Sequence, residues 1–242
     1  MRAGILIIGS LLWDNEYRSK WRRSHLCVES KFHVKTPIRY GRRSASRGNT
    51  FTMTFRTDCV LGQAVLVPCS RQVKDVSDLV SEATALWKAE QSSAANSIGA
   101  CWGCVGVAFR ADNPSTALLV EWHKYFRSKI SSTVSPVDEE GILHIPWPIM
   151  SAKDRPVDVD LLLATVTRAE INQPTVDEIV DAWVGQCDCY ERYFFENVRN
   201  GIRTADDCLI WRRIEERSPV WLKGGVYDEA VEVLQAEADQ SV

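Results

Sequence analysis

The sequence predicts an α+β protein with mostly antiparallel strands and a helical C-terminal region, and three observations support this prediction. The first third is rich in short strand-like segments joined by short connections, which favours antiparallel pairing. The middle of the chain alternates strand-like and helix-like segments. The last quarter carries only helical periodicity and helix-capping residues. No Gly/Ser-rich linker or internal repeat divides the 242 residues, so one domain with a helical extension is the simplest interpretation.

Strands are predicted where β-branched and aromatic residues cluster or alternate. The clearest alternation spans 50–56 and places Phe51, Met53 and Phe55 on one face of a strand. Further strands are expected at 4–8, 34–40 (interrupted by Pro37), 60–67, 104–110, 142–145 and 161–167.

Helices are predicted where apolar residues recur at helical spacing next to capping residues. Thr175 and Glu178 form a capping box, and Gly201 follows an aromatic-rich segment as a C-terminal capping glycine would. The expected helices are 16–24, 75–91, a segment from Asn113-Pro114 through Phe126, one beginning at Thr175, 190–200, 206–217 and 226–237.

Composition and charge exclude several classes of protein. With 45% hydrophobic and 25% charged residues, the chain is neither collagen-like, nor a coiled coil, nor broadly disordered. A net charge of −3 argues against nucleic-acid binding by the chain as a whole. However, residues 1–60 hold 12 Lys and Arg against 4 Asp and Glu. This basic segment suits an anionic small molecule or a phosphate backbone, and a solvated basic face is the alternative.

The eight cysteines are too irregularly spaced for a disulfide scaffold. Cys101 and Cys104 form a Cys-x-x-Cys pair that precedes a predicted strand, whereas a thioredoxin-type pair opens a helix. Together with Cys187 and Cys189 the pair could make a four-thiolate zinc site, but free thiols are the simpler interpretation. We therefore predict no metal and no cofactor. No segment approaches the ~20 apolar residues of a membrane span, so a cytoplasmic protein with no membrane partner is expected.

Two features near the N-terminus are candidates for binding a ligand. The first strand ends in Gly9-Ser10-Leu11, where a glycine with positive φ could turn the chain and leave successive N–H groups facing an anion. Arg39, Arg42, Arg43 and Arg47 follow on a predicted strand. Some of these arginines should share one face and could bind a carboxylate, or they could face solvent.

One carboxylate is a candidate general base. Glu90 lies at the end of the predicted 75–91 helix, after Trp87 and Ala89. An apolar wall and the negative end of the helix dipole both favour a carboxylate that accepts a proton near neutral pH. The alternative is an ordinary exposed helix glutamate.

The order of these features resembles the gamma-glutamylcyclotransferase-like family. That family shows Tyr-Gly-Ser-(Leu/Asn) after its first strand, and the chain reads Ile8-Gly9-Ser10-Leu11 there. Its glycine-containing apolar strand is matched around Gly62, and its short helix with the catalytic glutamate is matched by 86–90. The resemblance spans about residues 4–110. The chain departs from the pattern at Ile8, which replaces the tyrosine, and at Trp87, which replaces an aspartate.

The resemblance implies a small, mostly antiparallel β-barrel flanked by helices over residues 1–170, with 171–242 as a helical extension packed on it. It also implies an enzyme that cleaves a gamma-glutamyl amide by intramolecular aminolysis, giving 5-oxoproline and a free amine. Glu90 would be the general acid/base. The small-molecule substrate would be bound by residues near the turn and on the basic strand: Gly9, Ser10, Leu11, Trp13 and Arg42.

Two other functions agree with the sequence. A non-catalytic protein on the same fold could bind a small molecule or an anion in a degenerate pocket, as Ile8 and Trp87 suggest. The basic segment from Arg18 to Arg56 could instead bind an anionic partner in a salt-dependent manner. The C-terminal helices could cover the mouth of the barrel or form the surface of a homodimer.

Overall fold

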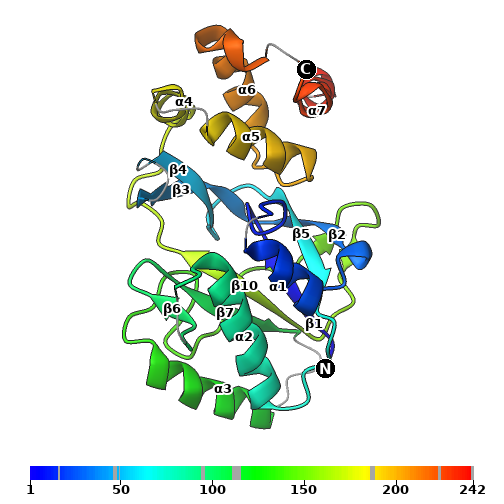
Figure 1. Cartoon of the computed structure of the whole chain (residues 1–242), viewed down its shortest axis with the longest axis vertical. Coiled ribbons are helices and arrows are strands. Elements are labelled where there is room, and N and C mark those ends of the chain that lie inside the picture. Colours follow the sequence, from blue (N-terminus) through cyan, green and yellow to red (C-terminus); the bar gives the residue numbers. More distant parts are fainter. Residues whose placement is uncertain are drawn as a thin grey trace.

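A computed structural model describes residues 1–15, 17–45, 48, 50–93, 96–110, 116–185, 189–222 and 225–240. These residues form a curled mixed sheet in the middle of the molecule, with helices covering it (Figure 1). The strands of the sheet, in the order in which they pair, are β6 (Gly99–Ala100), β7 (Gly103–Phe109), β10 (Leu161–Thr167), β1 (Ala3–Ile7), β5 (Gly62–Pro68), β2 (Phe32–Thr36), β8 (Ile149–Met150) and β9 (Arg155–Pro156).

Strand β1 lies at the centre of this sheet and is buried along its whole length. It pairs with β10 in parallel and with β5 in antiparallel orientation, while the other pairs in the sheet are antiparallel. This burial agrees with the unbroken apolar sequence of β1, because a strand covered on both faces does not alternate. The loop that follows β1 therefore starts from a rigid, central position.

A separate two-stranded ribbon packs against the curled sheet. It consists of β3 (Ile38–Ser44) and β4 (Thr50–Phe55). Thr54 of β4 donates a hydrogen bond of 2.8 Å from its hydroxyl to the carbonyl oxygen of Thr167 in β10. The register of the ribbon shifts between Tyr40 and Arg42, as at a β-bulge, which re-aims the side chains that follow.

The described helices are α1 (Arg18–His25), α2 (Val76–Glu90), α3 (Thr116–Lys129), α4 (Val176–Val184), α5 (Cys189–Arg199), α6 (Asp207–Arg217) and α7 (Asp228–Gln240), with short 3₁₀ turns at Val28–Ser30 and Pro219–Leu222. Helices α2 and α3 lie at one end of the molecule, and α4–α7 lie at the other, beyond the ribbon (Figure 1). None of the described helices is both long and apolar enough to cross a membrane.

The C-terminal helices are bonded to the ribbon and to the sheet. The indole N–H of Trp183 in α4 donates a 3.0 Å hydrogen bond to the carbonyl oxygen of Phe51 in β4. The backbone of Arg203 pairs with that of Gln63 in β5. Gly62 has no room for a side chain there, because a Cβ atom would lie 2.5 Å from the carbonyl oxygen of Arg203. The helices are thus closely packed on the strands that precede them.

The α+β class is confirmed, whereas the closed small barrel is not. The described part of the sheet is open, with β6 at one edge and β9 at the other, and the β3–β4 ribbon forms its own sheet. The strands at the two ends of the sheet, β6 on one side and β8 and β9 on the other, are only two residues long. These strands are too short to extend the pairing into a closed barrel. The expected strand at 142–145 is reduced to isolated bridges at Ile142 and Leu143.

Candidate active site

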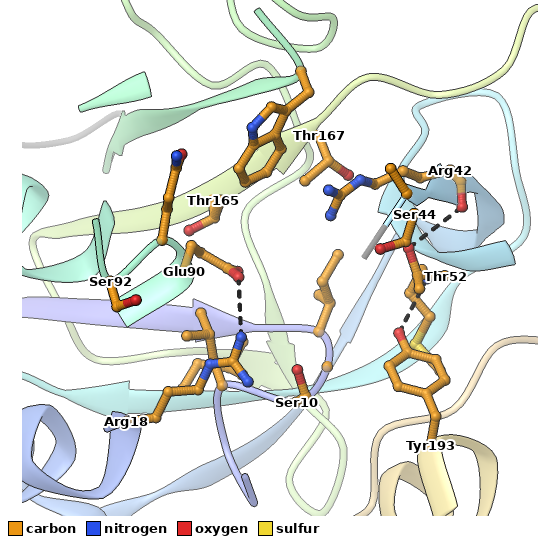
Figure 2. A pocket seen from close by; sticks show the side chains of 18 of the residues that line it. Ser10, Arg18, Arg42, Ser44, Thr52, Glu90, Ser92, Thr165, Thr167 and Tyr193 are labelled. Carbon is orange, nitrogen blue, oxygen red and sulfur yellow. Dashed lines mark hydrogen bonds and ion pairs between the residues drawn. The ribbon is translucent and has the colours of Figure 1, made fainter. Parts of the chain in front are cut away.

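A cavity of about 540 Å³ opens where the turn after β1, the β3–β4 ribbon and the end of α2 meet. Strand β10 and helix α5 also contribute to its wall. Of the residues singled out from the sequence, Gly9, Ser10, Leu11, Arg42 and Glu90 all line this one cavity. Glu90 and Arg42 reach into it from opposite sides in the view of Figure 2. The structure therefore brings Glu90 together with a turn that lies about eighty residues earlier in the sequence.

The turn after β1 is tight but does not use a left-handed glycine. The N–H of Leu12 donates to the carbonyl oxygen of Gly9 at 3.1 Å, and the N–H of Asp14 donates to that of Ser10 at 2.9 Å. Gly9 has no positive φ, so the expectation of a left-handed residue there is wrong. A Cβ atom on Gly9 would instead lie 3.4 Å from the hydroxyl oxygen of Tyr193. The absence of a side chain at position 9 thus keeps the space beside that hydroxyl clear.

Glu90 is the last residue of α2, and both ends of that helix are capped. The Asp75 carboxylate accepts hydrogen bonds from the N–H groups of Ser77 and Asp78, which fixes the first turn. At the other end the N–H of Gln91 bonds to the carbonyl oxygen of Trp87. The side chain of Glu90 is 20% exposed, so it is largely removed from solvent but still reaches the cavity.

A cation that the sequence analysis did not assign to the site lies beside Glu90. The guanidinium of Arg18 in α1 places Nη2 4.0 Å from Oε2 of Glu90, as Figure 2 shows. Its Nε donates a 3.0 Å hydrogen bond to the carbonyl oxygen of Ala89, and it also forms an ion pair with Asp14. An adjacent positive charge favours the ionised form of a carboxylate. The Arg18 guanidinium lies within ion-pair distance of the candidate base.

Three stacked side chains form another part of the site. The guanidinium of Arg42 lies 4.4 Å from the ring centre of Trp102. That indole in turn stacks on Trp87, with ring centres 4.7 Å apart. Trp87 is 1% exposed, so the residue that departs from the family pattern is a buried support for Trp102. A cation on an aromatic face keeps its charge near the cavity at little desolvation cost.

Hydroxyl groups line the rest of the wall. Thr165 and Thr167 extend from β10 into the region between Glu90 and Arg42 in Figure 2. The Thr165 hydroxyl is buried and has no hydrogen-bond partner among the described residues. Buried polar atoms in proteins are nearly always hydrogen-bonded, so this hydroxyl is suited to meet a polar group of a ligand.

Trp13 does not line the cavity, unlike the other residues named with it. Its indole N–H donates a 2.8 Å hydrogen bond to Asn197 in α5, and its ring packs edge-on against Tyr193 at 6.3 Å. Trp13 thus supports the wall from behind. The residues that sequence reasoning missed are Arg18, Trp102, Thr165 and Tyr193. The basic character of 16–24 and the aromatic character of 190–200 were visible, but neither pointed to the cavity.

The arginines of the predicted basic segment, 18–56, do not all face solvent. Arg18, Arg22 and Arg39 are each at least nine-tenths buried, so they do not contribute to an open basic face. Arg43 lines the cavity with its guanidinium 4.3 Å from the ring centre of Phe51. Arg47 lies outside the described residues.

The cysteines do not form a metal site within the described part of the chain. Cys101 is exposed and Cys104 is buried, and burial raises the pKa of the Cys104 thiol to about 11. Such a thiol remains protonated at neutral pH in the absence of a metal. Among the described residues, no three His, Cys, Asp or Glu side chains are grouped so that they could hold a metal ion, but Cys187 lies outside these residues.

Comparisons of the chain with protein-family models, with curated protein sequences and with solved structures find no match.

Proposed function

We propose that the chain is an enzyme that cyclises a gamma-glutamyl amide, releasing 5-oxoproline and an amine, with Glu90 as the general acid/base. One observation supports this assignment above the others. Glu90 and the Gly9–Leu11 turn, which the family resemblance pairs, line the same cavity. A carboxylate and a bent backbone segment are the two elements that this reaction needs, because ring closure depends mainly on positioning and proton transfer.

The reaction proceeds by addition and elimination at the gamma carbonyl carbon. Glu90 accepts a proton from the α-ammonium group, and the freed amine attacks the gamma carbon to form the new C–N bond of the five-membered ring. The carbonyl electron pair moves to oxygen and gives a tetrahedral oxyanion. As the oxyanion collapses, the original amide C–N bond breaks and Glu90 returns the first proton to the departing nitrogen. The second proton of the former ammonium group passes from the ring nitrogen through Glu90 to the released amine, which leaves as an ammonium ion. Atoms and charge balance without an oxidant or a metal.

The charges of the cavity wall agree with such a substrate. Arg42 and Arg43 lie on the ribbon side and could bind a carboxylate of the substrate. Glu90 lies on the other side and suits the ammonium group. The cationic and anionic sides would orient an amino-acid derivative with its amine toward Glu90.

The test is 5-oxoproline release from a panel of gamma-glutamyl amino acids and gamma-glutamyl amines by the purified protein. The Glu90→Gln substitution keeps the size and polarity of the side chain but cannot accept the proton. We expect it to lower kcat by 10²-fold or more, on the order of the usual contribution of a general base. Glu121→Gln, at an exposed position of α3, is the matched control and should leave kcat unchanged. Equal turnover by the wild type and Glu90→Gln would contradict the assignment.

A second candidate function is a non-catalytic binding protein that recognises an anion in the same cavity. The observation that favours it is the contact of Arg18 with Glu90, because a carboxylate engaged by a guanidinium is a weaker base. Calorimetric binding of gamma-glutamyl compounds without any product would support this alternative. Product formation that depends on Glu90 would exclude it.

A further inference from the structure

The arginines of strand β3 line two different cavities. Arg42 and Arg43 line the cavity that contains Glu90, whereas Arg39 lines a separate cavity of about 190 Å³. The register shift between Tyr40 and Arg42 separates the two groups, because an irregularity of this kind changes the direction of the side chains that follow it. The smaller cavity takes no part in the proposed function.

The smaller cavity is built from four segments of the chain. Arg39 comes from β3, Asp58 and Cys59 come from the loop after β4, Gln173 comes from the loop before α4, and Asp206 directly precedes α6. Pockets for drug-sized ligands usually measure roughly 300–1,000 Å³. This cavity therefore suits a ligand with few non-hydrogen atoms.

Arg39 is a buried cation with no counter-ion among the residues that the structure describes. The residue is 5% exposed, and its Nε atom is fully buried without a hydrogen-bond partner. The two terminal nitrogens also form no hydrogen bond or ion pair with described residues, but they are not among the fully buried atoms. They are therefore the part of the guanidinium that a ligand in the cavity can reach. Buried charges in proteins are nearly always paired, because removing an unpaired ion from water is costly.

The neighbouring groups do not supply the missing partner. Asp58 accepts two hydrogen bonds from the guanidinium of Arg56, and the Cys59 thiol donates to the carbonyl oxygen of Arg56 at 3.0 Å. No carboxylate oxygen of Asp206 lies within 4.0 Å of a nitrogen of Arg39. Burial and the charge of Arg56 lower the pKa of Arg39, and the nearby acidic groups only partly offset this decrease. A negative charge closer to the guanidinium would stabilise it.

We propose that this cavity is a binding site for a small ligand with one carboxylate group, which pairs with the terminal nitrogens of Arg39. A guanidinium binds a carboxylate through two parallel N–H···O hydrogen bonds. Because Nε is buried, the carboxylate approaches from the side of the two terminal nitrogens. A doubly charged phosphate fits less well, because Asp58 and Asp206 add negative charge to the wall. The same two side chains suit an ammonium group, so the carboxylate belongs to a free amino acid or to a simple organic acid.

The first test is an NMR titration of the full-length protein with acetate and with glycine. The probe is the signal of the Arg39 Nε–H group, which is identified by its absence from the spectrum of Arg39→Lys. We expect both ligands to shift this signal until it saturates, with potassium chloride as the control for ionic strength. Arg39→Lys keeps the charge but loses the planar fork, so thermal titrations should show binding about 10-fold weaker than in the wild type.

A second variant separates ligand binding from a role of Arg39 in the fold. Arg39→Met keeps a long side chain without the charge, and we expect it to have a higher Tm than the ligand-free wild type, because an unpaired buried cation is removed. A ligand that binds only the folded state raises Tm. Acetate and glycine should therefore raise the Tm of the wild type more than that of Arg39→Met. Arg71→Met, at an exposed position before α2, is the matched control and should respond as the wild type does.

The possible outcomes distinguish the ligand from its alternatives. A response of the Arg39 signal to glycine but not to acetate would support an amino acid as the source of the carboxylate. A response to inorganic phosphate but to neither carboxylate would overturn the assigned ligand class. An unmoved Arg39 signal, or equal increases in Tm for the wild type and Arg39→Met, would overturn the site itself. These measurements need no turnover of a gamma-glutamyl compound, so their result is independent of the proposed function.

Discussion

Arg18 reaches from α1 to the end of α2, where its guanidinium contacts both Glu90 and the residue before it. One guanidinium nitrogen lies 4.0 Å from the Glu90 carboxylate, and another donates a hydrogen bond to the carbonyl oxygen of the preceding residue, Ala89. The first contact places a positive charge within ion-pair distance of the carboxylate. The second fixes the last turn of the helix and hence the direction in which the Glu90 side chain leaves the backbone. Arg18 is thus a positioning residue for the candidate base.

Substituting Arg18 should lower the activity of the site without unfolding the protein. Arg18→Met removes both contacts, and we expect kcat on a gamma-glutamyl substrate to fall by about 10-fold to 100-fold through misplacement of Glu90. Arg18→Lys keeps the charge but not the planar fork, so its loss should be smaller. Arg23→Gln, at an exposed position of the same helix, is the control. Wild-type kinetics in Arg18→Met would show that Glu90 does not depend on this contact.

The attachment of the ribbon to the sheet gives a test of stability. The hydroxyl of Thr54 donates to the carbonyl oxygen of Thr167, and the Thr167 hydroxyl lies 3.3 Å from that of Thr54, with both side chains buried. Thr54→Val preserves the shape but removes the hydroxyl, so we expect a loss of about 1–3 kcal/mol in the free energy of unfolding. Thr54→Ser retains the donor and should lose less. Urea denaturation measures the free energy of unfolding of both variants. An unchanged value for Thr54→Val would mean that this hydrogen bond does not contribute to stability.

Much of the secondary structure could be predicted from local patterns. The strand at 161–167 is found with the predicted bounds, and the capping box at Thr175 is present with both of its hydrogen bonds. Gly201 follows α5 with a φ of 72°, as a C-terminal capping glycine does. These features depend on residues close in sequence. The N-cap expected at Asn113 lies outside the described residues.

The arrangement of the ribbon could not be predicted in the same way. The 50–56 segment has the expected alternation, yet all six residues of β4 are buried, including its threonines. Helix α4 contacts the strand through Trp183, and β10 contacts it through Thr167, and both partners lie more than 100 residues away. An alternating sequence indicates that one face of a strand is apolar. It does not indicate whether a second layer of the structure covers the other, polar face. The separation of the ribbon from the main sheet is therefore a long-range property.

Only part of the candidate site could be predicted from the sequence, for a similar reason. Glu90 and the Gly9–Leu11 turn could be found because the resemblance covers them. The presence of Arg18 and Tyr193 in the cavity wall could not be predicted, because it depends on how α1 and α5 pack against the cavity. Neither residue differs in sequence from the many arginines and tyrosines that pack on surfaces or in cores. Only the tertiary contacts distinguish them.

Asp207, the first residue of α6, is a buried carboxyl group at the base of the C-terminal helices. It is 1% exposed and accepts a hydrogen bond from the Thr204 hydroxyl. Burial raises the pKa of Asp207 to about 7, while the hydrogen bonds from Thr204 and the charge of Arg203 oppose the rise. The group is therefore protonated in the folded protein under mildly acidic conditions, whereas in the unfolded chain it has an ordinary pKa of 3.8.

This difference predicts a stability that decreases with pH. Between about pH 4 and pH 7 the folded state binds a proton that the unfolded state has lost, so the free energy of unfolding should fall as the pH rises. The contribution is complete below pH 4 and absent above pH 7, and it amounts to something on the order of 2–4 kcal/mol.

The Asp207→Asn variant tests this prediction, because its side chain stays neutral throughout. Subtracting the free energy of unfolding of this variant from that of the wild type cancels the contributions of the other titrating groups. This difference should become less positive or more negative between pH 4 and pH 7, as measured by urea titrations at successive pH values. Asp206→Asn, at a partly exposed neighbouring position, should keep the wild-type slope. Parallel curves for wild type and Asp207→Asn would mean that Asp207 is ionised in the folded protein at all these pH values.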